Sequence, residues 1–343
     1  MTTQAAATED QLRRLLHAVR PGWRFGRAWQ LSGSTAARVS ALEAEEPDGQ
    51  RRTLVLHQYG AANLQADPHV ATHEYRLLDL LATAGLPVPR PYLADESCSI
   101  MPSPYLLQEF IDGDCILDPP DLAAFTGELA AALAALHSVG IDQADVPFLA
   151  DVRDDTARMM QTRSTQASAF KWAAAVLATL RAAWPPPQLN RSVILHGDYW
   201  PGNVLWRDDK LVGVVDWEDA LFGDPLADLA VTRLEVGWFY GPAAMNILTS
   251  QYLALRTDLD ASALPLWDLR AAMRASGFAI ETWGLSAERL AAVRAAYDDF
   301  AAHAVRQVGP RRTAPDQTGR APSTSFHGLQ RHCPADPRRA ADA

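Results

Sequence analysis

Two acids and an amide stand at a spacing that suits a magnesium–nucleotide site. The run HGDYWPGN covers residues 196–203, and Asp216 follows it after a short segment. Carboxylate and amide oxygens are ligands that Mg²⁺ accepts beside phosphates and water, so Asn203 and Asp216 fit a metal pair. Asp198 is then available to accept a proton from a hydroxyl group. This order of Asp, Asn and Asp matches the template for phosphoryl transfer.

Short apolar runs on both sides of this motif are expected to position it. Residues 192–195 (SVIL) read as a strand whose end carries the first half of the motif. Residues 204–215 read as a tight hairpin with the polar turn RDDK at 207–210. Such a hairpin brings Asp216 back beside Asn203.

The motif HGDYWPGN, together with VVDWEDALFGDPLADLA over residues 214–230, resembles the aminoglycoside phosphotransferase and choline kinase superfamily. These proteins are relatives of the protein kinases that phosphorylate small molecules. The resemblance implies Asp198 as the catalytic base, Asn203 and Asp216 as Mg²⁺ ligands, and ATP as the phosphate donor. It also implies an α+β, protein-kinase-like two-lobe fold, with a small antiparallel-sheet N-terminal lobe and a mainly helical C-terminal lobe.

The order of elements along the chain fits that fold. Residues 1–110 are expected to form the nucleotide-binding lobe, with a hinge near 108–113, and residues 114–308 the helical catalytic and substrate lobe. From residue 309 the composition shifts to Pro, Arg, Ser and Thr, which predicts a disordered tail over 309–343. Helical spacing of apolar residues is expected over 9–19, 74–81, 122–137, 152–183 with a break at 162–168, 227–240, 243–255, 266–274 and 287–308.

Three segments of the first lobe are expected to contact the nucleotide. The turn Ser32-Gly33-Ser34-Thr35 would cover the ATP phosphates with backbone N–H groups. Residues 105–113 read as an edge strand that ends in a turn. The resemblance makes this segment the hinge, and it implies that the backbone of Glu109, Phe110 and Ile111 hydrogen-bonds adenine.

One position departs from the family pattern. A strand Lys is expected to pair with a helix Glu and to hold the phosphates; Glu74 fits the helix position, but the strand over 53–57 ends in His57. Beside Glu74 and a triphosphate the pKa of His57 should rise. The hypothesis is that His57 replaces Lys with reduced strength, so that ATP binds less tightly at high pH. Arg38 is a second candidate cation.

Composition limits the partners and the compartment. Apolar residues make up 48% and charged residues 21% of the 343 residues, as in soluble globular proteins. No stretch approaches the ~18 apolar residues of a membrane span. The N-terminus lacks a signal region, and the three cysteines are too few and too scattered for a disulfide framework, so a cytoplasmic protein without a membrane partner is expected.

The net charge of −10 argues against nucleic acid as a binding partner. A monomer or a homodimer is expected.

The acceptor stays open at this point. A small-molecule hydroxyl is expected, on an aminoglycoside- or macrolide-like antibiotic or on a metabolic alcohol such as choline, homoserine or a sugar. An anionic face from Asp219, Asp224, Glu235, Asp268 and Glu281 would suit an amine, and Trp217, Trp238, Trp267 and Trp283 would suit an apolar or sugar substrate. Two other functions remain: a nucleotide-binding pseudokinase-like module with little or no turnover, and a metal-dependent phosphohydrolase that uses His196 and Asp198.

Overall fold

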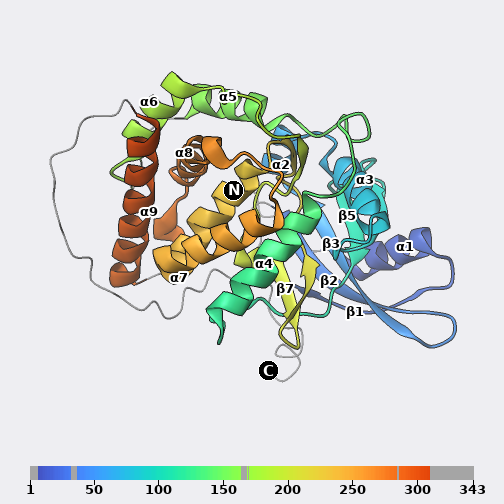
Figure 1. The fold of residues 1–343 in the computed structure, drawn as a ribbon. Helices are drawn as coiled ribbons and strands as arrows, with labels where there is room; N and C mark the ends of the chain where they lie inside the picture. Colours follow the sequence, from blue (N-terminus) through green and yellow to red (C-terminus); the bar gives the residue numbers. More distant parts are fainter. Residues whose placement is uncertain (1–6, 32–36, 164–167, 169, 284–285, 310–343) are drawn as a thin grey trace. The chain divides into compact units, whose positions relative to one another are not determined.

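The computed structural model describes residues 7–31, 37–163, 168, 170–283 and 286–309. The predicted phosphate turn with Ser32, Gly33 and Ser34, and the predicted tail from residue 310 onward, lie outside these residues. The described chain forms two compact units, and it passes from one to the other after Cys115, after Pro201 and after Glu218 (Figure 1). The first unit therefore contains residues 202–218 in addition to the N-terminal part of the chain.

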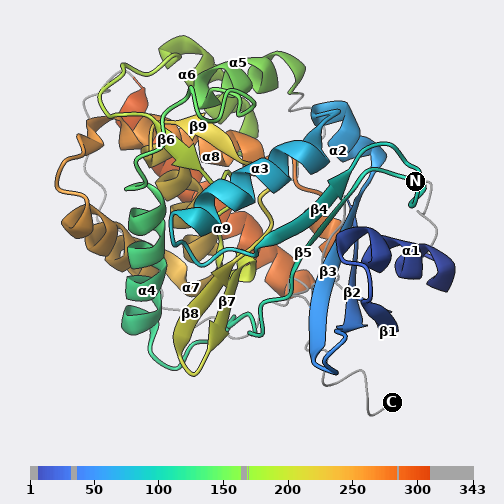
Figure 2. The ribbon, with the colours of Figure 1, turned by 90° about the vertical axis from the view of Figure 1, so that its right-hand side faces the viewer.

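An antiparallel sheet of five strands forms the centre of the first unit (Figure 2). The strands are β1 (Arg24–Gln30), β2 (Ala37–Glu45), β3 (Arg51–Tyr59), β4 (Pro91–Asp95) and β5 (Tyr105–Glu109), in the order β1-β2-β3-β5-β4. The helices of this unit are α1 (Glu9–Val19), α2 (Ala61–Ala66) and α3 (Val70–Thr83). Helix α1 contacts β1, and α3 contacts β4 and β5.

The two faces of the sheet bury different residues, because side chains alternate along a strand. One face packs against α1 through a cluster that includes Leu12, Leu15, Leu16, Leu42, Leu54, Leu56 and Leu107. The other face carries a smaller cluster of Leu31, Ala41 and Val55, with Trp29, Val39 and Phe110 packed against it. The three leucines of α1 follow the helical spacing that the sequence predicts.

Strand β5 is internal, and the prediction of an edge strand over residues 105–113 is wrong. It pairs with β3 on one side and with β4 on the other. The edge is formed by β4, which begins at Pro91 in a segment that its prolines marked only as extended. Proline has no N–H to donate to a ladder, so the edge of a sheet is where it is tolerated. Sequence reasoning therefore missed β4 and assigned its place at the edge of the sheet to β5.

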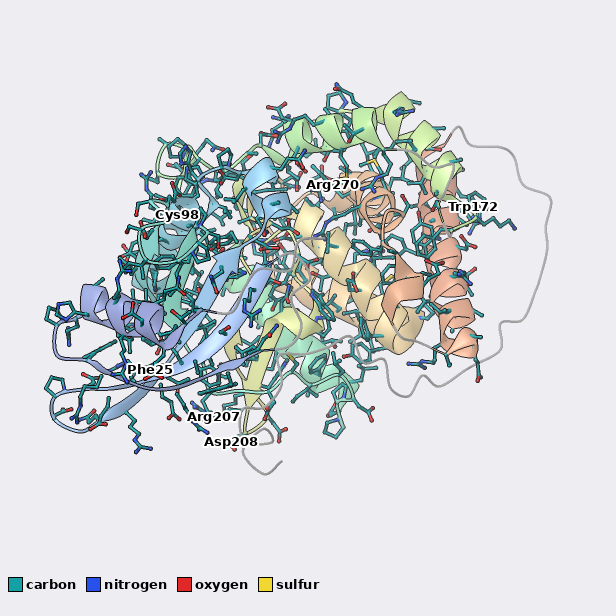
Figure 3. All side chains as sticks on the ribbon, turned by 180° about the vertical axis from the view of Figure 1, so that it is seen from behind. Phe25, Cys98, Trp172, Arg207, Asp208 and Arg270 are labelled. Atoms are coloured by element: carbon teal, nitrogen blue, oxygen red, sulfur yellow. The ribbon has the colours of Figure 1, made fainter. Side chains whose placement is uncertain are left out.

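The predicted hairpin is present in the first unit. Strands β7 (Val204–Arg207) and β8 (Lys210–Val214) pair antiparallel. The two turn residues Asp208 and Asp209 have φ angles of 52° and 58°. Positive φ at both central residues is the geometry of a type I′ turn, whose twist matches that of the flanking strands. Arg207 and Asp208 mark the tip of this hairpin in Figure 3.

Backbone hydrogen bonds attach the hairpin to segments far away in the sequence. Asp114 and Trp206 exchange a pair of N–H···O bonds, each of 2.8 Å. The N–H of Val214 donates to the carbonyl of Pro87 over 2.7 Å. These bonds join residues 202–218 to the end of the N-terminal segment and make the hairpin part of the first unit.

The second unit is mainly helical. Its helices are α4 (Leu122–Leu136), α5 (Val152–Thr162), α6 (Ala173–Ala183), α7 (Leu226–Leu255), α8 (Leu264–Ala275) and α9 (Ala287–Val308), with short 3₁₀ turns at Ala261–Ala263 and Ile280–Trp283. Helix α7 contacts α4, α8 and α9 (Figure 1). Strands β6 (Val193–Leu195) and β9 (Leu221–Gly223) pair antiparallel. A sheet unit and a helical unit together make the α+β fold that the sequence predicts.

Two breaks predicted in the helical part are confirmed. Helix α5 ends at Thr162 and α6 begins at Ala173, so the two helices are separate, and residues 164–167 of the predicted break lie outside the described residues. Helix α7 is interrupted at Gly241, whose φ of 86° and ψ of 172° are not helical, just before Pro242. In the described part of the chain, no helix is both long and apolar enough to cross a membrane.

Candidate active site

The backbone of the motif loop is held by a buried carboxylate from α7. Strand β6 ends at Leu195, and the N–H of His196 donates to Oδ2 of Asp228 over 2.7 Å. The N–H of Gly197 donates to Oδ1 of the same carboxylate over 2.9 Å. Asp228 is almost fully buried. Both of its oxygens thus fix the turn that precedes Asp198, which goes beyond the helix-capping role that the sequence suggests for this residue.

Two further buried groups support Asp228. Nε2 of His137 lies 3.2 Å from Oδ2 of Asp228, and Nδ1 of His137 lies 2.6 Å from the hydroxyl oxygen of Tyr252. Burial alone would raise the pKa of Asp228, but hydrogen bonds from His137 and Gly197 bring it below its usual value. The carboxylate is therefore ionised, and His137 is a buried partner of it behind the loop.

Gly197 allows the motif loop to pass close to the backbone of Asp219. Its φ is +81°, in the left-handed region that glycine adopts without strain. A Cβ at this position would lie 1.9 Å from the carbonyl oxygen of Asp219. The loop therefore has no room for a side chain at Gly197, which fixes the position of the next residue, Asp198.

The side chain of Asp198 is held by an arginine that the sequence analysis did not single out. Nη1 of Arg274, in the last turn of α8, lies 2.8 Å from Oδ1 of Asp198. Nη2 of the same guanidinium lies 2.6 Å from Oδ2 of Asp219. The Asp198 side chain is 23% exposed and that of Arg274 is 17% exposed, so this pair is only partly shielded from water.

The two predicted metal ligands lie in the first unit, next to the hairpin. Asn203 is buried and Asp216 is exposed. The N–H of Val215 donates to the carbonyl of Asn203 over 2.9 Å, which ties the residue before Asp216 to the start of β7. Asp216 has a φ of +71°, in the left-handed region that aspartate adopts more readily than most residues other than glycine. An amide oxygen and a carboxylate on adjoining segments form a donor set that fits Mg²⁺.

Glu74 has a different partner from the one that the sequence suggests. Its Oε2 accepts a hydrogen bond of 2.7 Å from the hydroxyl of Tyr59, which follows His57 on the same face of β3. Burial raises the pKa of Glu74 to about 7, against hydrogen bonds from Tyr59 and from the backbone of Trp217. Burial also raises the pKa of Tyr59 well above its usual value.

His57 does not have the charge that the hypothesis requires. It is buried, and burial lowers its pKa to about 4 instead of raising it. Its nearest acid is Glu218, with 3.8 Å between Nε2 and Oε2, and that carboxylate also accepts a hydrogen bond of 2.8 Å from Asn63. Arg38 pairs in register with Gln58, and it therefore lies on the opposite face of the sheet from His57.

Residues 30–263 match the model of the phosphotransferase enzyme family, which is more than half of the chain. The chain belongs to this family. Acyl-CoA dehydrogenase family member 10 of Mus musculus is 30% identical over 210 residues, which are 57% of this chain and 19% of that protein. Homoserine kinase of Rhodospirillum rubrum is 28% identical over 213 residues, which are 58% of this chain and 65% of that protein. The chain thus spans about a fifth of the first relative's length and about two thirds of the second's.

Solved structures of phosphotransferases share the fold. Aminoglycoside phosphotransferase APH(4)-Ia, as a thermostable mutant with AMP-PNP and hygromycin B, superposes with a TM-score of 0.60 at 18% identity. That match covers 87% of this chain and 99% of the other. Macrolide 2'-phosphotransferase type I gives a TM-score of 0.56 at 21% identity, over 85% of this chain and 98% of the other. The family and its kinase-like fold, inferred from HGDYWPGN and the segment after it, are therefore confirmed.

Within this family member, the predicted adenine segment follows β5. The N–H of Glu109 donates to the carbonyl of Arg90 over 2.8 Å. Phe110, the next residue, packs against the apolar cluster of Leu31, Ala41 and Val55. An adenine contact would therefore involve the carbonyl of Glu109 and the N–H groups of the residues that follow.

Four of the nine residues considered for an acceptor surface have structural roles in the second unit. Asp268 forms a two-pronged ion pair with Arg233, with N···O distances of 3.0 Å and 3.1 Å. Asp224 accepts from Asn190 and caps the N-terminus of α7 at the N–H of Leu226. Trp238 and Trp267 are buried in the core. Among the described residues, no group of three or more His, Cys, Asp or Glu side chains is placed to hold a metal ion.

Proposed function

We propose that this protein is an ATP- and Mg²⁺-dependent O-phosphotransferase that moves the γ-phosphate of ATP to a hydroxyl group of a small molecule. The observation that carries the proposal is the HGDYWPGN loop, whose backbone is fixed by Asp228 and whose Asp198 side chain is held in one orientation. Membership of the phosphotransferase enzyme family supports the reaction class. Solved relatives of the same fold hold the ATP analogue AMP-PNP, which supports ATP as the donor.

Asp198 is the proposed catalytic base. Its carboxylate would orient the acceptor hydroxyl toward the γ-phosphate and take the hydroxyl proton as the new P–O bond forms. Because phosphoryl transfer depends mainly on positioning and charge, the fixed backbone at His196 and Gly197 matters as much as the carboxylate itself.

Asn203 and Asp216 are the proposed ligands of Mg²⁺. A bound Mg²⁺ would neutralise charge on the phosphate oxygens. The hydrogen bond between Val215 and Asn203 keeps the two donors on adjoining segments of the first unit. The positive φ of Asp216 sets the direction of its side chain at the end of β8.

The nucleotide contacts are proposed for the first unit. The apolar cluster around Val55, which includes Phe110, offers a surface for adenine, and the backbone from Glu109 to Ile111 offers the hydrogen-bonding groups. Backbone N–H groups of residues 32–34 would bind the phosphates. His57 and Glu74 would shape this region as neutral or weakly charged groups, because burial lowers the pKa of the first and raises that of the second.

The acceptor is proposed to be an alcohol on a small molecule. Relatives named for aminoglycosides, macrolides and homoserine favour this class. The cytoplasm supplies the ATP that such a reaction requires, and a monomer or a homodimer is the proposed state.

The test is a screen for transfer of labelled γ-phosphate to hygromycin B, a macrolide, L-homoserine, choline and simple sugars. Asp198→Ala should lower the rate with the best acceptor by about 10²–10⁴-fold, the usual size of general-base assistance, and leave ATP binding largely intact. Asp216→Ala should lower the rate and also weaken Mg²⁺-ATP binding. Asp208→Asn at the tip of the same hairpin is the matched control and should behave as wild type. Wild-type rates for both Asp198→Ala and Asp216→Ala would refute the assignment.

The burial of His57 favours one competing function. A nucleotide-binding pseudokinase-like module would bind ATP but transfer no phosphate to any acceptor in the screen. The neutral His57 at the position of the family's lysine is the observation behind it. Nucleotide binding by calorimetry, together with no transfer and no ATP hydrolysis, would support this alternative.

A further inference from the structure

Arg274 links two acids that belong to different parts of the second unit. It lies in the last turn of α8, and it contacts Asp198 in the motif loop and Asp219 in the segment just before β9. Its guanidinium also lies over the ring of Phe278, with 5.9 Å from Cζ to the ring centroid. Three contacts in three directions leave the planar guanidinium little freedom to rotate.

We propose that Arg274 is the positioning residue of Asp198: its hydrogen bond to Oδ1 fixes the direction of the carboxylate that would receive the proton of the acceptor hydroxyl. This inference rests on the proposed function, in which Asp198 is the base. Without that contact the Asp198 side chain would sample several rotamers even on a fixed backbone, and only one of them would be aligned for transfer. The hydrogen bond of 2.8 Å between Nη1 and Oδ1 selects one.

The guanidinium also places a positive charge beside the carboxyl group of Asp198. An adjacent cation favours the ionised form of a carboxyl group. Burial alone would lower the pKa of Arg274, but Asp198 and Asp219 raise it above its usual value, so the arginine stays charged.

Other titratable groups lie near Asp198 and Arg274. His196 accepts the backbone N–H of Asp198 at Nδ1 over 3.3 Å, and it is fully buried. Behind it, the acid Asp228 binds the loop backbone. Glu235 of α7 acts on Arg274 and helps to keep it charged. Arg274 is therefore the cation whose removal should change the carboxyl group of Asp198.

The same helix offers a matched control. Arg270 lies one turn before Arg274 on α8, is more deeply buried, and is labelled in Figure 3. Its Nε donates to the hydroxyl of Thr156 over 2.8 Å, and its Nη2 lies 3.5 Å from Asp155. Arg270 thus connects α8 to α5, so Arg270→Gln removes a buried arginine of the same helix without touching the motif loop.

The first measurement needs neither ATP nor an acceptor. The full chain is labelled with ¹³C at aspartate carboxyl groups, the Asp198 signal is assigned from its loss in Asp198→Asn, and the midpoint of its titration is measured. Arg274→Gln should raise that midpoint by about 1–3 pH units, the usual effect of a neighbouring arginine on an aspartate. Arg274→Lys should give a smaller rise, and Arg270→Gln no rise. An equal midpoint in wild type and in folded Arg274→Gln would overturn the proposal.

The second measurement uses the acceptor with the highest rate in the screen. Arg274→Gln should lower kcat by about 10²-fold, as expected for a misplaced reacting group, and leave the KM for ATP unchanged. Arg274→Lys should restore part of kcat. A rate that rises in Arg274→Gln would show that the arginine restrains Asp198, which would also overturn the proposal. If no acceptor is phosphorylated by any variant, the proposed function fails, while the titration still decides the role of Arg274.

Discussion

The hydroxyl of Tyr59 donates a hydrogen bond to Oε2 of Glu74 over 2.7 Å, whereas the sequence predicts an ion pair between this carboxylate and a cation on the strand. Both side chains are buried. Tyr59 and His57 lie on the same face of β3, and Nε2 of the His57 imidazole lies 3.8 Å from Oε2 of Glu218. A tyrosine–glutamate hydrogen bond thus replaces an ion pair in this part of the first unit.

Removal of that hydroxyl should destabilise the protein. In Tyr59→Phe the buried carboxylate of Glu74 loses its side-chain donor, so the free energy of unfolding should fall by about 1–3 kcal/mol. Urea denaturation at pH 8 measures the change. Tyr92→Phe is the control, because the Tyr92 hydroxyl only accepts from Arg52 at a partly exposed site, and its effect should stay within about 0.5 kcal/mol. Equal effects of the two substitutions would contradict the role given to Glu74.

Glu74 should make stability depend on pH. Its pKa is raised from 4.5 to about 7 in the folded protein, so its contribution to stability is complete below about pH 4.5 and is lost as the pH rises through 7. Glu74→Gln does not titrate. The stability of wild type relative to Glu74→Gln should therefore fall between pH 5 and pH 8, by at most about 3 kcal/mol. A difference between the two proteins that stays constant over this range would show that Glu74 is ionised normally.

His57 should have no influence on how ATP affinity varies with pH. Because burial lowers its pKa to about 4, the imidazole is neutral from pH 6 to pH 8. The ratio of the ATP dissociation constants of His57→Gln and wild type should then change by less than about twofold over this range. Calorimetry at saturating Mg²⁺ measures it. A ratio that increases steeply toward pH 6 would show that bound nucleotide protonates His57, as the sequence hypothesis holds.

Gly197 should tolerate no side chain. Gly197→Ala places a Cβ against the backbone carbonyl of Asp219 as well as at a positive φ, whereas Gly49→Ala has a φ of +84° and nothing within 4 Å. The control should lose about 1–2 kcal/mol from its backbone conformation. Gly197→Ala should lose about 1–3 kcal/mol more from the overlap and should also lower phosphate transfer, because Asp198 is the next residue. Similar stabilities of the two variants would mean that the loop can move away from Asp219.

Local sequence patterns were sufficient to predict the motif and the elements that position it. The turn at Asp208 and Asp209, the strand before His196 and the break in α7 at Gly241 depend on neighbouring residues, and each is where the sequence places it. The roles of Asp198, Asn203 and Asp216 remain predictions, since their order is what indicates them.

Contacts between distant segments could not be read from the sequence. Arg274 follows Asp198 by 76 positions, and nothing in the pattern of α8 distinguishes it from Arg270. The pKa of His57 was expected to rise because only charges were considered, whereas burial determines it in the structure. β4 was missed because it begins at Pro91, and proline is tolerated only in a strand that pairs on one side, at the edge of a sheet.

The first unit is completed late during translation, because its residues 202–218 follow a long segment of the second unit in the chain. The hairpin of β7 and β8, which hydrogen-bonds to Asp114 and Pro87, is translated only after the whole of residues 116–201. At the usual rate of chain growth this is a delay on the order of ten seconds. The unit that begins first on the ribosome is therefore completed late, and until then the backbone groups of Asp114 and Pro87 must be satisfied by water or by a chaperone.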